Sequence, residues 1–268
     1  MLNKKRTLLI SLKYLLLTLI LTAGLVTITA SGGGGSDDSS STDDTTDDTT
    51  DDTTNTSQYD PNNLPSGPTF TGTYDGSGAT LITLGSPISI NGAGATANGS
   101  VVTITASGTY NISQDLPSSP FSGQIKVDIA DTTTDTDDVW LYLNGINLAC
   151  SDSAPIDIES AARVIVVLAD GTTNYLIDGD STSALDEDSE NIDAALYSKE
   201  DLVIYGTGTL NVDANYLDGI KSKDGLIIHS GTIIVNSNDD GISGKNYVSV
   251  EDGDITIDAG GDGIKATN

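Results

Sequence analysis

The stretch that decides the fold is DGIKSKDGLIIHSGTIIVNSNDDGIS, residues 218–243, because it contains its own repeat. The tripeptide Asp-Gly-Ile begins at Asp218, returns at Asp240 and appears again at Asp262, a step of 22 residues each time. Between the copies lie short runs with apolar side chains at alternate positions, bounded by Gly, Asp, Asn and Ser, a pattern typical of short strands. A unit of this size cannot bury a core alone, so successive units must stack. The sequence therefore predicts an all-β solenoid, a right-handed parallel β-helix with coils of about 22 residues.

Alternation within the strands assigns the two faces of each coil. We expect six residues in register to point into the core: Leu202, Ile204, Leu226, Ile228, Val248 and Val250. The residues between them should point outward, and four outward positions form an apolar stripe: Trp140, Ile165, Val203 and Ile227. Soluble proteins rarely leave such a stripe bare. We expect the insertion 179–193 or the segment before Ala79 to cover it, with a sugar-stacking face as the alternative.

The chain divides into three parts. Residues 1–31 carry basic residues, an apolar stretch at 14–28 and small residues at the end, which indicates a signal peptide or a signal anchor. Residues 32–68 form an acidic Gly/Ser/Asp/Thr linker that we expect to be disordered. The β-helix should occupy 79–268, and we expect further coils beyond Asn268, because an uncapped coil leaves an open strand edge.

Composition limits the compartment and the partners. The net charge of −28, from 39 acidic and 11 basic side chains, argues against nucleic acid and favours solubility and cation binding. The segment around Ser31 resembles a lipoprotein cleavage site in which Ser replaces the required Cys, so we expect a secreted or cell-surface protein with no stable membrane insertion of the mature domain, and a monomer. The single cysteine, Cys150, lies in a strand pattern and is predicted to be a small core residue.

Carboxylates cluster in two places that predict calcium binding. Stacking would place Asp218, Asp240 and Asp262 about 4.8 Å apart, where unpaired carboxylates repel. A bound cation relieves this repulsion, and so do hydrogen bonds to turn amides, with the Gly after each Asp allowing a tight corner by positive φ. The insertion supplies five more acids: Asp186, Glu187, Asp188, Glu190 and Asp193. Calcium prefers such oxygen ligands, although a solvated loop is the alternative.

Basic residues gather beside the aspartates. Five lysines fall in the corner segments, together with one tyrosine: Lys199, Lys221, Lys223, Lys245, Lys265 and Tyr197. We interpret them as a substrate-binding ridge for the carboxylates of an acidic polymer, and salt bridges to neighbouring Asp and Glu are the alternative. His229, the single histidine, is predicted to be a surface residue beside Tyr205 and Glu251.

Several segments together resemble a family of secreted bacterial carbohydrate-binding proteins with a pectate-lyase-like fold. They are VWLYLNGINL, VIVVLADGTTNYLIDG, AALYSKEDLVIYGTGTLNV, DGIKSKDGLII and DDGISGKNYVSVEDGDITIDAGGDGIKATN. The resemblance covers about residues 79–268. It implies a right-handed parallel β-helix, bound calcium, and binding of polygalacturonate (pectin) or cellulose without cleavage.

Two other functions stay open. A calcium-dependent pectate lyase needs Ca²⁺ to acidify a proton and a Lys or Arg base to remove it. The regular spacing of the lysines favours binding over catalysis, because a catalytic base occupies one singular position. A cell-surface adhesin or matrix protein would use the solenoid as a rigid rod.

Overall fold

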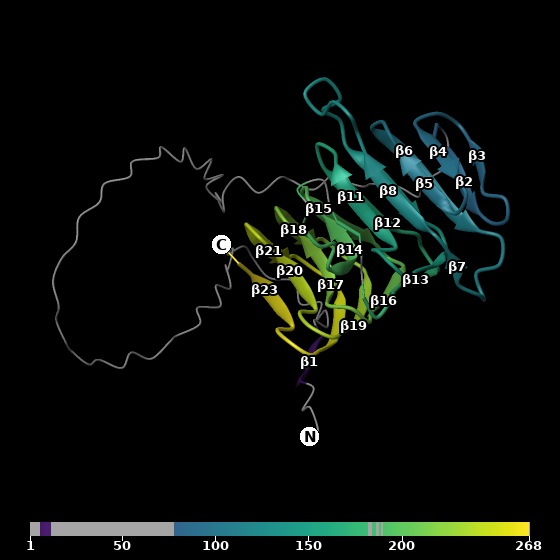
Figure 1. Cartoon of the computed structure of the whole chain (residues 1–268). Coiled ribbons are helices and arrows are strands. Elements are labelled where there is room, and N and C mark those ends of the chain that lie inside the picture. Colours follow the sequence, from purple (N-terminus) through teal and green to yellow (C-terminus); the bar gives the residue numbers. More distant parts are fainter. Residues whose placement is uncertain (1–5, 12–77, 182–183, 186–187, 189, 268) are drawn as a thin grey trace, which may run out of the picture. The chain divides into compact units, whose positions relative to one another are not determined.

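The computed structural model describes residues 6–11, 78–181, 184–185, 188 and 190–267 (Figure 1). They fall in one compact unit, Met1–Leu12 with Tyr59–Asn268, and the predicted linker lies outside the described residues. The described part is entirely β, and none of its elements is a helix long and apolar enough to cross a membrane.

Three sheets build the domain, and each of the later coils contributes one strand to each sheet. Sheet I contains β7 (Phe121–Ser122), β10 (Asn147–Cys150), β13 (Thr173–Asp178), β16 (Thr209–Ala214), β19 (Thr232–Ser237), β22 (Asp254–Ala259) and β1 (Arg6–Ser11). Sheet II contains β4 (Ala95–Asn98), β5 (Val101–Ile104), β8 (Gln124–Asp128), β11 (Ile156–Ser160), β14 (Ala194–Ser198), β17 (Asp218–Ser222), β20 (Ile242–Gly244) and β23 (Ile264–Ala266). Sheet III contains β3 (Ser89–Asn91), β2 (Thr80–Leu84), β6 (Gly108–Gln114), β9 (Val139–Leu143), β12 (Val164–Leu168), β15 (Leu202–Gly206), β18 (Gly225–Ile228) and β21 (Tyr247–Val250).

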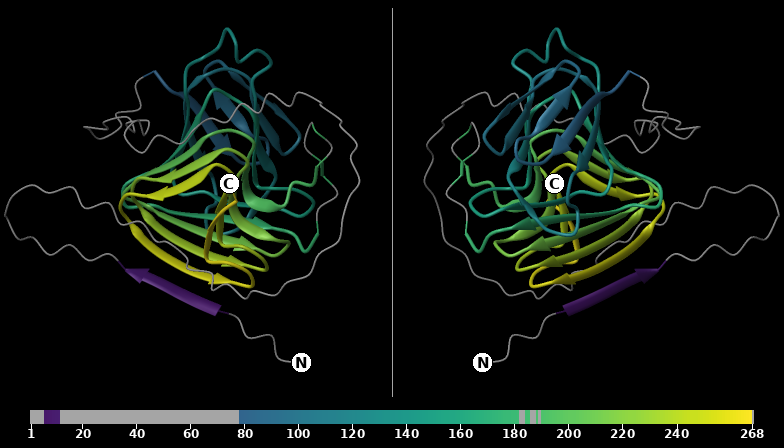
Figure 2. Two further views of the ribbon diagram at one scale, coloured as in Figure 1. Left: turned by 90° about the vertical axis from the view of Figure 1, so that its left-hand side faces the viewer. Right: turned by 90° about the vertical axis from the view of Figure 1, so that its right-hand side faces the viewer.

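Neighbouring strands within each sheet are parallel except at the ends. β2 pairs with β3, β4 with β5, and β1 with β22 in antiparallel fashion. Figure 2 looks along the stack and shows successive strands following one another around a common interior, with β1 beside the last strand of sheet I. This arrangement is consistent with a parallel β-helix or solenoid. β1 falls inside the predicted signal segment.

Register follows the repeated tripeptide. Ile220 pairs with Ile242, and Ile242 with Ile264, so the pairing joins residues 22 positions apart. The glycine of the tripeptide is needed for space and not for a positive φ. A Cβ at Gly219 would lie 2.3 Å from the Val235 side chain, and one at Gly241 would lie 2.4 Å from Ile257. Neither glycine is among those with positive φ, so the predicted reason for the glycine is wrong.

The core lies between the three sheets. Four of the six residues predicted to point inward, Leu202, Ile204, Leu226 and Ile228, are fully buried in the main cluster. Val248 is partly buried against it, whereas Val250 is 43% exposed. Both belong to β21, the last strand of sheet III, where one flank has no strand among the described residues to cover it.

Candidate functional site

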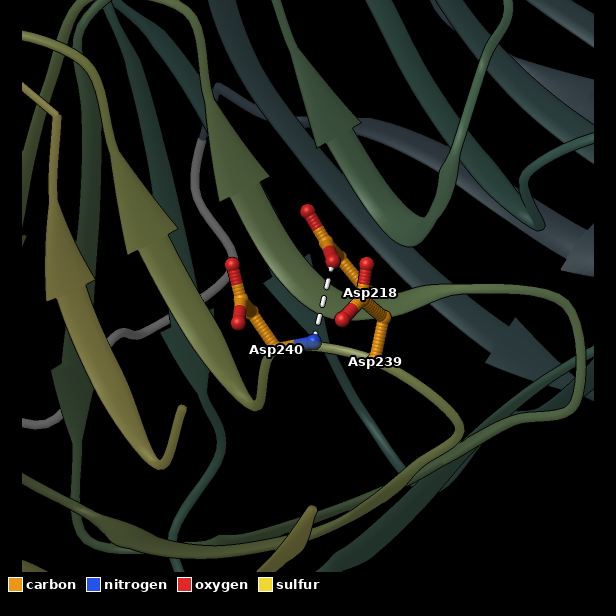
Figure 3. Close-up of side chains that lie close together, drawn as sticks. All are labelled: Asp218, Asp239 and Asp240. Carbon is orange, nitrogen blue, oxygen red and sulfur yellow. Dashed lines mark hydrogen bonds between the residues drawn. The ribbon is translucent and has the colours of Figure 1, made fainter. Parts of the chain in front are cut away.

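The repeated aspartates tie one coil to the next. Asp218 Oδ1 accepts a hydrogen bond from the backbone N–H of Asp240 (3.1 Å), and Asp240 Oδ1 accepts one from the N–H of Asp262 (2.8 Å). Asp218 Oδ2 also accepts a hydrogen bond from the Ser243 hydroxyl (3.2 Å). Figure 3 shows Asp218, Asp239 and Asp240 around this corner, with the bond from the Asp240 amide dashed. Of the two predicted ways to relieve repulsion, amide hydrogen bonding is present.

Lysines bind the remaining oxygens of the same carboxylates. Lys221 Nζ lies 2.6 Å from Asp193 Oδ2 and 3.1 Å from Asp218 Oδ2, and Lys265 Nζ lies 2.8 Å from Asp240 Oδ2. Burial raises the pKa of Asp218, although the Lys221 charge opposes this. Burial acts to lower the pKa of Lys221, but its bonds to the two carboxylates outweigh burial and raise it. Lys221 is therefore firmly protonated in its place beside β14.

The insertion between β13 and β14 lies over the outward face of sheet II. Lys199 Nζ contacts Asp188 Oδ2 at 2.6 Å, and Lys223 forms an ion pair with Glu190. Ile192 packs with Ala154, Ala194 and Tyr197 in a small second core, together with Ala184. Lysines that follow the strands of sheet II and carboxylates of the insertion therefore hold each other.

The burial of Tyr197 corrects its predicted place in the substrate-binding ridge. Its register in sheet II is as expected, since it pairs with Asp157 on one side and Lys221 on the other. Its side chain, however, is only 1% exposed, because the insertion packs on top of it. This cover could not be predicted from the repeat, because the insertion breaks the repeat and the coil register does not determine its path. Tyr197 is a packing residue and not a ligand contact.

The predicted cation ridge and the predicted metal ligands are largely each other's partners. Lys199, Lys221, Lys223 and Lys265 all pair with carboxylates from the predicted metal set: Asp188, Asp193, Asp218, Glu190 and Asp240. Lys245 differs: it is exposed, and its side chain has no ion-pair partner among the described residues. Asp262 is also exposed, and Asp186 and Glu187 lie outside the described residues.

Calcium fits the aspartate corner poorly. Asp218, Asp239 and Asp240 each offer an oxygen within 4.8 Å of the others, which is close enough to share a cation. Both oxygens of Asp218 and Asp240, however, already face N–H, O–H or ammonium donors. Asp193 keeps one oxygen, Oδ1, without a hydrogen-bond partner among the described residues, but this atom is buried and Oδ2 is held by Lys221.

A cleft of about 660 Å³ opens between the insertion and the earlier coils. Its floor is the outward face of β8 and β11, where Lys126 pairs in register with Asp157. Lys126 Nζ lies 3.7 Å from Glu159 Oε1, and Lys199 Nζ lies 3.9 Å from Glu159 Oε2. Asp157 and Glu159 are 2% and 3% exposed. The cleft thus has a charged floor that is largely withdrawn from solvent.

The walls of the cleft carry both polar and apolar side chains. They include Gln124, whose Nε2 donates hydrogen bonds to the Ser153 hydroxyl and the Ala154 carbonyl, and Asp178 at the end of β13. Asp178 Oδ1 accepts hydrogen bonds from the backbone N–H groups of Asn215 and Tyr216. Burial nevertheless raises the pKa of Asp178 to about 6. This carboxyl therefore changes charge in mildly acidic solution.

Sequence reasoning missed this cleft. The sequence pattern that indicates the cleft is Ile156-Asp157-Ile158-Glu159, where acids alternate with core isoleucines on one strand. This strand precedes the regular 22-residue repeat of the later coils. Cys150 also lines the cleft and is only partly buried, so its prediction as a core residue is wrong. It ends β10 at the cleft margin, and burial raises the pKa of its thiol, which keeps it protonated and a weak nucleophile.

The single histidine takes no part in the cleft. His229 stacks on Tyr205, with ring centroids 5.3 Å apart, and its Nδ1 contacts Glu251, which directly follows β21. This arrangement confirms the predicted neighbours of His229.

The cleft thus combines carboxylates, one lysine, amides and hydroxyls, a set that suits hydrogen bonding to a polar ligand.

Comparisons with known proteins find similarity to proteins whose descriptions refer to carbohydrates. Residues 98–268 match the family model described as "Carbohydrate-binding domain-containing protein". A protein of Acetivibrio thermocellus with the same description is 37% identical over 133 residues, which cover 50% of this chain and 42% of that relative. The chain therefore spans less than half the length of this relative. A solved structure described as the polysaccharide lyase-like protein from C. thermocellum, gadolinium derivative, is 25% identical, with a TM-score of 0.58 over 70% of this chain and 94% of the other.

Proposed function

Because the chain belongs to the family of carbohydrate-binding domain-containing proteins, we propose that it is a non-catalytic polysaccharide-binding protein whose polymer lies in the cleft over β8 and β11. The cleft itself is the observation that carries this proposal. It is concave and lined by amides, hydroxyls and charged groups, which are the partners that sugar hydroxyls require. The ion pairs of Lys126 and Lys199 with the buried Glu159 hold its floor in one arrangement, so little side-chain freedom is lost on binding.

The preferred polymer in this proposal is acidic, such as polygalacturonate (pectin), with cellulose as a neutral second ligand. The net charge of −28 repels a polyanion, and four of the five ridge lysines already have carboxylate partners. We therefore propose that calcium bridges the polymer to protein carboxylates, since it accepts oxygen ligands from both.

The proposal extends to the finer fold and the location. The parallel sheets and the 22-residue pairing support a right-handed β-helix with coils of about 22 residues. The basic and apolar N-terminal residues support export, followed by release or retention at the bacterial surface. We expect the mature domain to act as a monomer.

Binding is tested by affinity electrophoresis in gels that contain polygalacturonate or soluble cellulose derivatives, with calcium or with EGTA. The informative variant is Ser151→Trp, because Ser151 is exposed at the cleft and an indole there would obstruct it. The matched control is Thr136→Trp, at an exposed position that does not line the cleft. We expect polygalacturonate to retard the parent and the control only with calcium, and to retard Ser151→Trp at least five-fold less. Equal retardation of all three proteins would show that the polymer does not bind in the cleft.

One observation favours a lyase as the second candidate. Lys126 lies beside the buried acids Asp157 and Glu159, and a structurally similar protein is described as polysaccharide lyase-like. A lysine base must face the proton that it removes, whereas Lys126 Nζ faces Glu159 and Asp128 of the protein itself. Binding without cleavage is therefore the better account. Incubation with polygalacturonate and calcium decides between them, because a lyase would produce the ultraviolet absorbance of unsaturated uronates.

A further inference from the structure

A second, smaller hollow adjoins the cleft on the outward face of sheet I. It has a volume of about 310 Å³ and is formed by the ends of β16 and β19 and by the residues that follow them. β13, β16 and β19 are neighbours in sheet I (Figure 1). Ile177 of β13 lines both the hollow and the cleft, so the two meet at one side chain.

One row of outward side chains runs from the cleft into the hollow. Ala149 of β10 pairs in register with Ile177, and Ile177 pairs with Asp213. Asp213 in turn pairs with Asn236 of β19. Ala149 lines the cleft, whereas Asp213 and Asn236 line the hollow. Because neighbouring strands are about 4.8 Å apart, the row crosses four strands in about 14 Å, and an extended polymer that follows it passes over Ile177.

The amide nitrogens of the hollow are turned toward the protein. Asn236 Nδ2 donates a hydrogen bond to Asp213 Oδ1 (2.8 Å), and Asn215 Nδ2 donates one to the Asp178 carbonyl (2.8 Å). Asn238 Nδ2 donates to the Asn215 carbonyl. All three asparagines are exposed. Their oxygens are therefore the atoms that remain for a ligand, and the hollow offers it mainly hydrogen-bond acceptors.

The charge of the hollow decides which sugar units fit these acceptors. Among the described residues that line it, none is basic and one, Asp213, is acidic. A uronate carboxylate has only acceptor atoms and a negative charge, so Asp213 repels it. A sugar hydroxyl has a proton to donate to the oxygens, and the C–H groups of a neutral sugar pack on Ile177. The hollow therefore suits an uncharged unit that is rich in hydroxyl groups.

We propose that the cleft continues over Ile177 into this hollow, and that the hollow around Asp213 and Asn236 is a subsite for neutral sugar units. This inference rests on the proposed function, because the polymer enters the hollow from the cleft. Neutral polymers contact both places, whereas the contacts of an acidic polymer end at Ile177. Substitutions in the hollow should therefore change the binding of neutral polymers and leave that of polygalacturonate as it is.

The test is affinity electrophoresis of the full chain in gels with hydroxyethylcellulose and EGTA, or with polygalacturonate and calcium. The variant Asn236→Ala with Asn238→Ala removes two acceptors of the hollow. The control Asn91→Ala with Asn144→Ala removes two exposed asparagines that line neither the cleft nor the hollow. We expect hydroxyethylcellulose to retard the first variant at least three-fold less than the parent and the control, and polygalacturonate to retard all three equally. Far-ultraviolet circular dichroism checks that both variants keep their strands.

A charge substitution tests the selection against acidic units. Asp213→Lys places an ammonium group in the hollow, and polygalacturonate with calcium should then retard the protein at least two-fold more than the parent. Asp254→Lys is the matched control, because it makes the same change of charge at an exposed position of β22 outside the hollow. Equal retardation of these two variants would refute the selection by charge.

The Ser151→Trp variant separates failure of the hollow from failure of the cleft. Full retardation of the Asn236/Asn238 variant by hydroxyethylcellulose, together with a loss for Ser151→Trp, would show that the polymer binds in the cleft and not in the hollow. A loss for the Asn236/Asn238 variant without a loss for Ser151→Trp would make the hollow a separate site and refute the continuous groove. Full retardation of both variants would refute the cleft and the hollow together.

Discussion

Lys221 is the residue whose removal the structure predicts to be most costly among the ridge lysines. Its ammonium lies between Asp193 and Asp218, and the side chain of Asp218 is only 6% exposed. The change Lys221→Ala leaves Asp218 as a buried carboxylate without its cation. Removing one partner of a fully buried pair costs about 3–5 kcal/mol, whereas an exposed pair is worth about 0–1 kcal/mol.

The expected loss lies between these limits. The Lys221 side chain is 27% exposed, so water screens part of the interaction. Asp218 also keeps two other donors, the Asp240 amide and the Ser243 hydroxyl. We therefore expect Lys221→Ala to lower the free energy of unfolding by about 2 kcal/mol. The matched control is Lys245→Ala, which removes an exposed lysine and should change this free energy by less than about 0.5 kcal/mol.

Urea unfolding followed by circular dichroism measures both changes, and a double variant identifies their cause. Asp218→Asn keeps an oxygen to accept the Asp240 amide proton but carries no charge. In the Lys221→Ala background it should therefore restore at least half of the lost stability, about 1 kcal/mol. Equal stability of the Lys221→Ala and Lys245→Ala variants, or no recovery in the double variant, would refute the argument that Lys221 compensates a buried charge.

Three further predictions concern protons, binding and metal. Because burial raises the pKa of Asp178 from 3.8 to about 6, the folded state holds this proton more tightly than the unfolded state, so this carboxyl reduces stability progressively as pH rises from about 4 to above 6. Asp178→Asn should then stabilise the protein at pH 8 by on the order of 2–3 kcal/mol and by almost nothing near pH 3.5. Urea unfolding at both pH values measures this change. The same difference in stability between variant and parent at both pH values would contradict the argument. Lys245→Ala should weaken polygalacturonate binding at low salt by about 1.4- to 5-fold, as expected for one exposed ion pair, and titration calorimetry should show the effect vanish at high salt. Millimolar calcium should raise the melting temperature relative to EGTA by several degrees, since a ligand at 100 times its Kd adds about 2.7 kcal/mol, and coincident melts would count against a calcium site.

The sequence contained enough to predict the strands but not the surface that covers them. The repeat of Asp218, Asp240 and Asp262 predicted the strands and which of their side chains point inward or outward. The observed pairing of Lys221 with Ser243 and of Ser243 with Lys265 follows the same step of 22 residues. The insertion has no such constraint, since its path depends on tertiary contacts made by Ile192 and Asp193. The burial of Tyr197 and the pairing of Lys221 with Asp193 therefore could not be read from periodicity. The salt-bridge alternative for the lysines did anticipate the pairing of Lys221 with Asp218.

The pairing of the lysines also decides where binding energy can come from. To bind a uronate carboxylate, Lys221 must release Asp193 or Asp218, so one carboxylate contact replaces another of similar strength. The exchange adds little net affinity, and it returns the buried Asp218 to an unpaired state. A lysine with no such partner, Lys245, contributes its full but small ion-pair energy. We therefore propose that the greater part of the affinity for a polymer arises in the cleft beside Lys126 and Glu159, where burial lowers the local dielectric and would strengthen each hydrogen bond to the sugar.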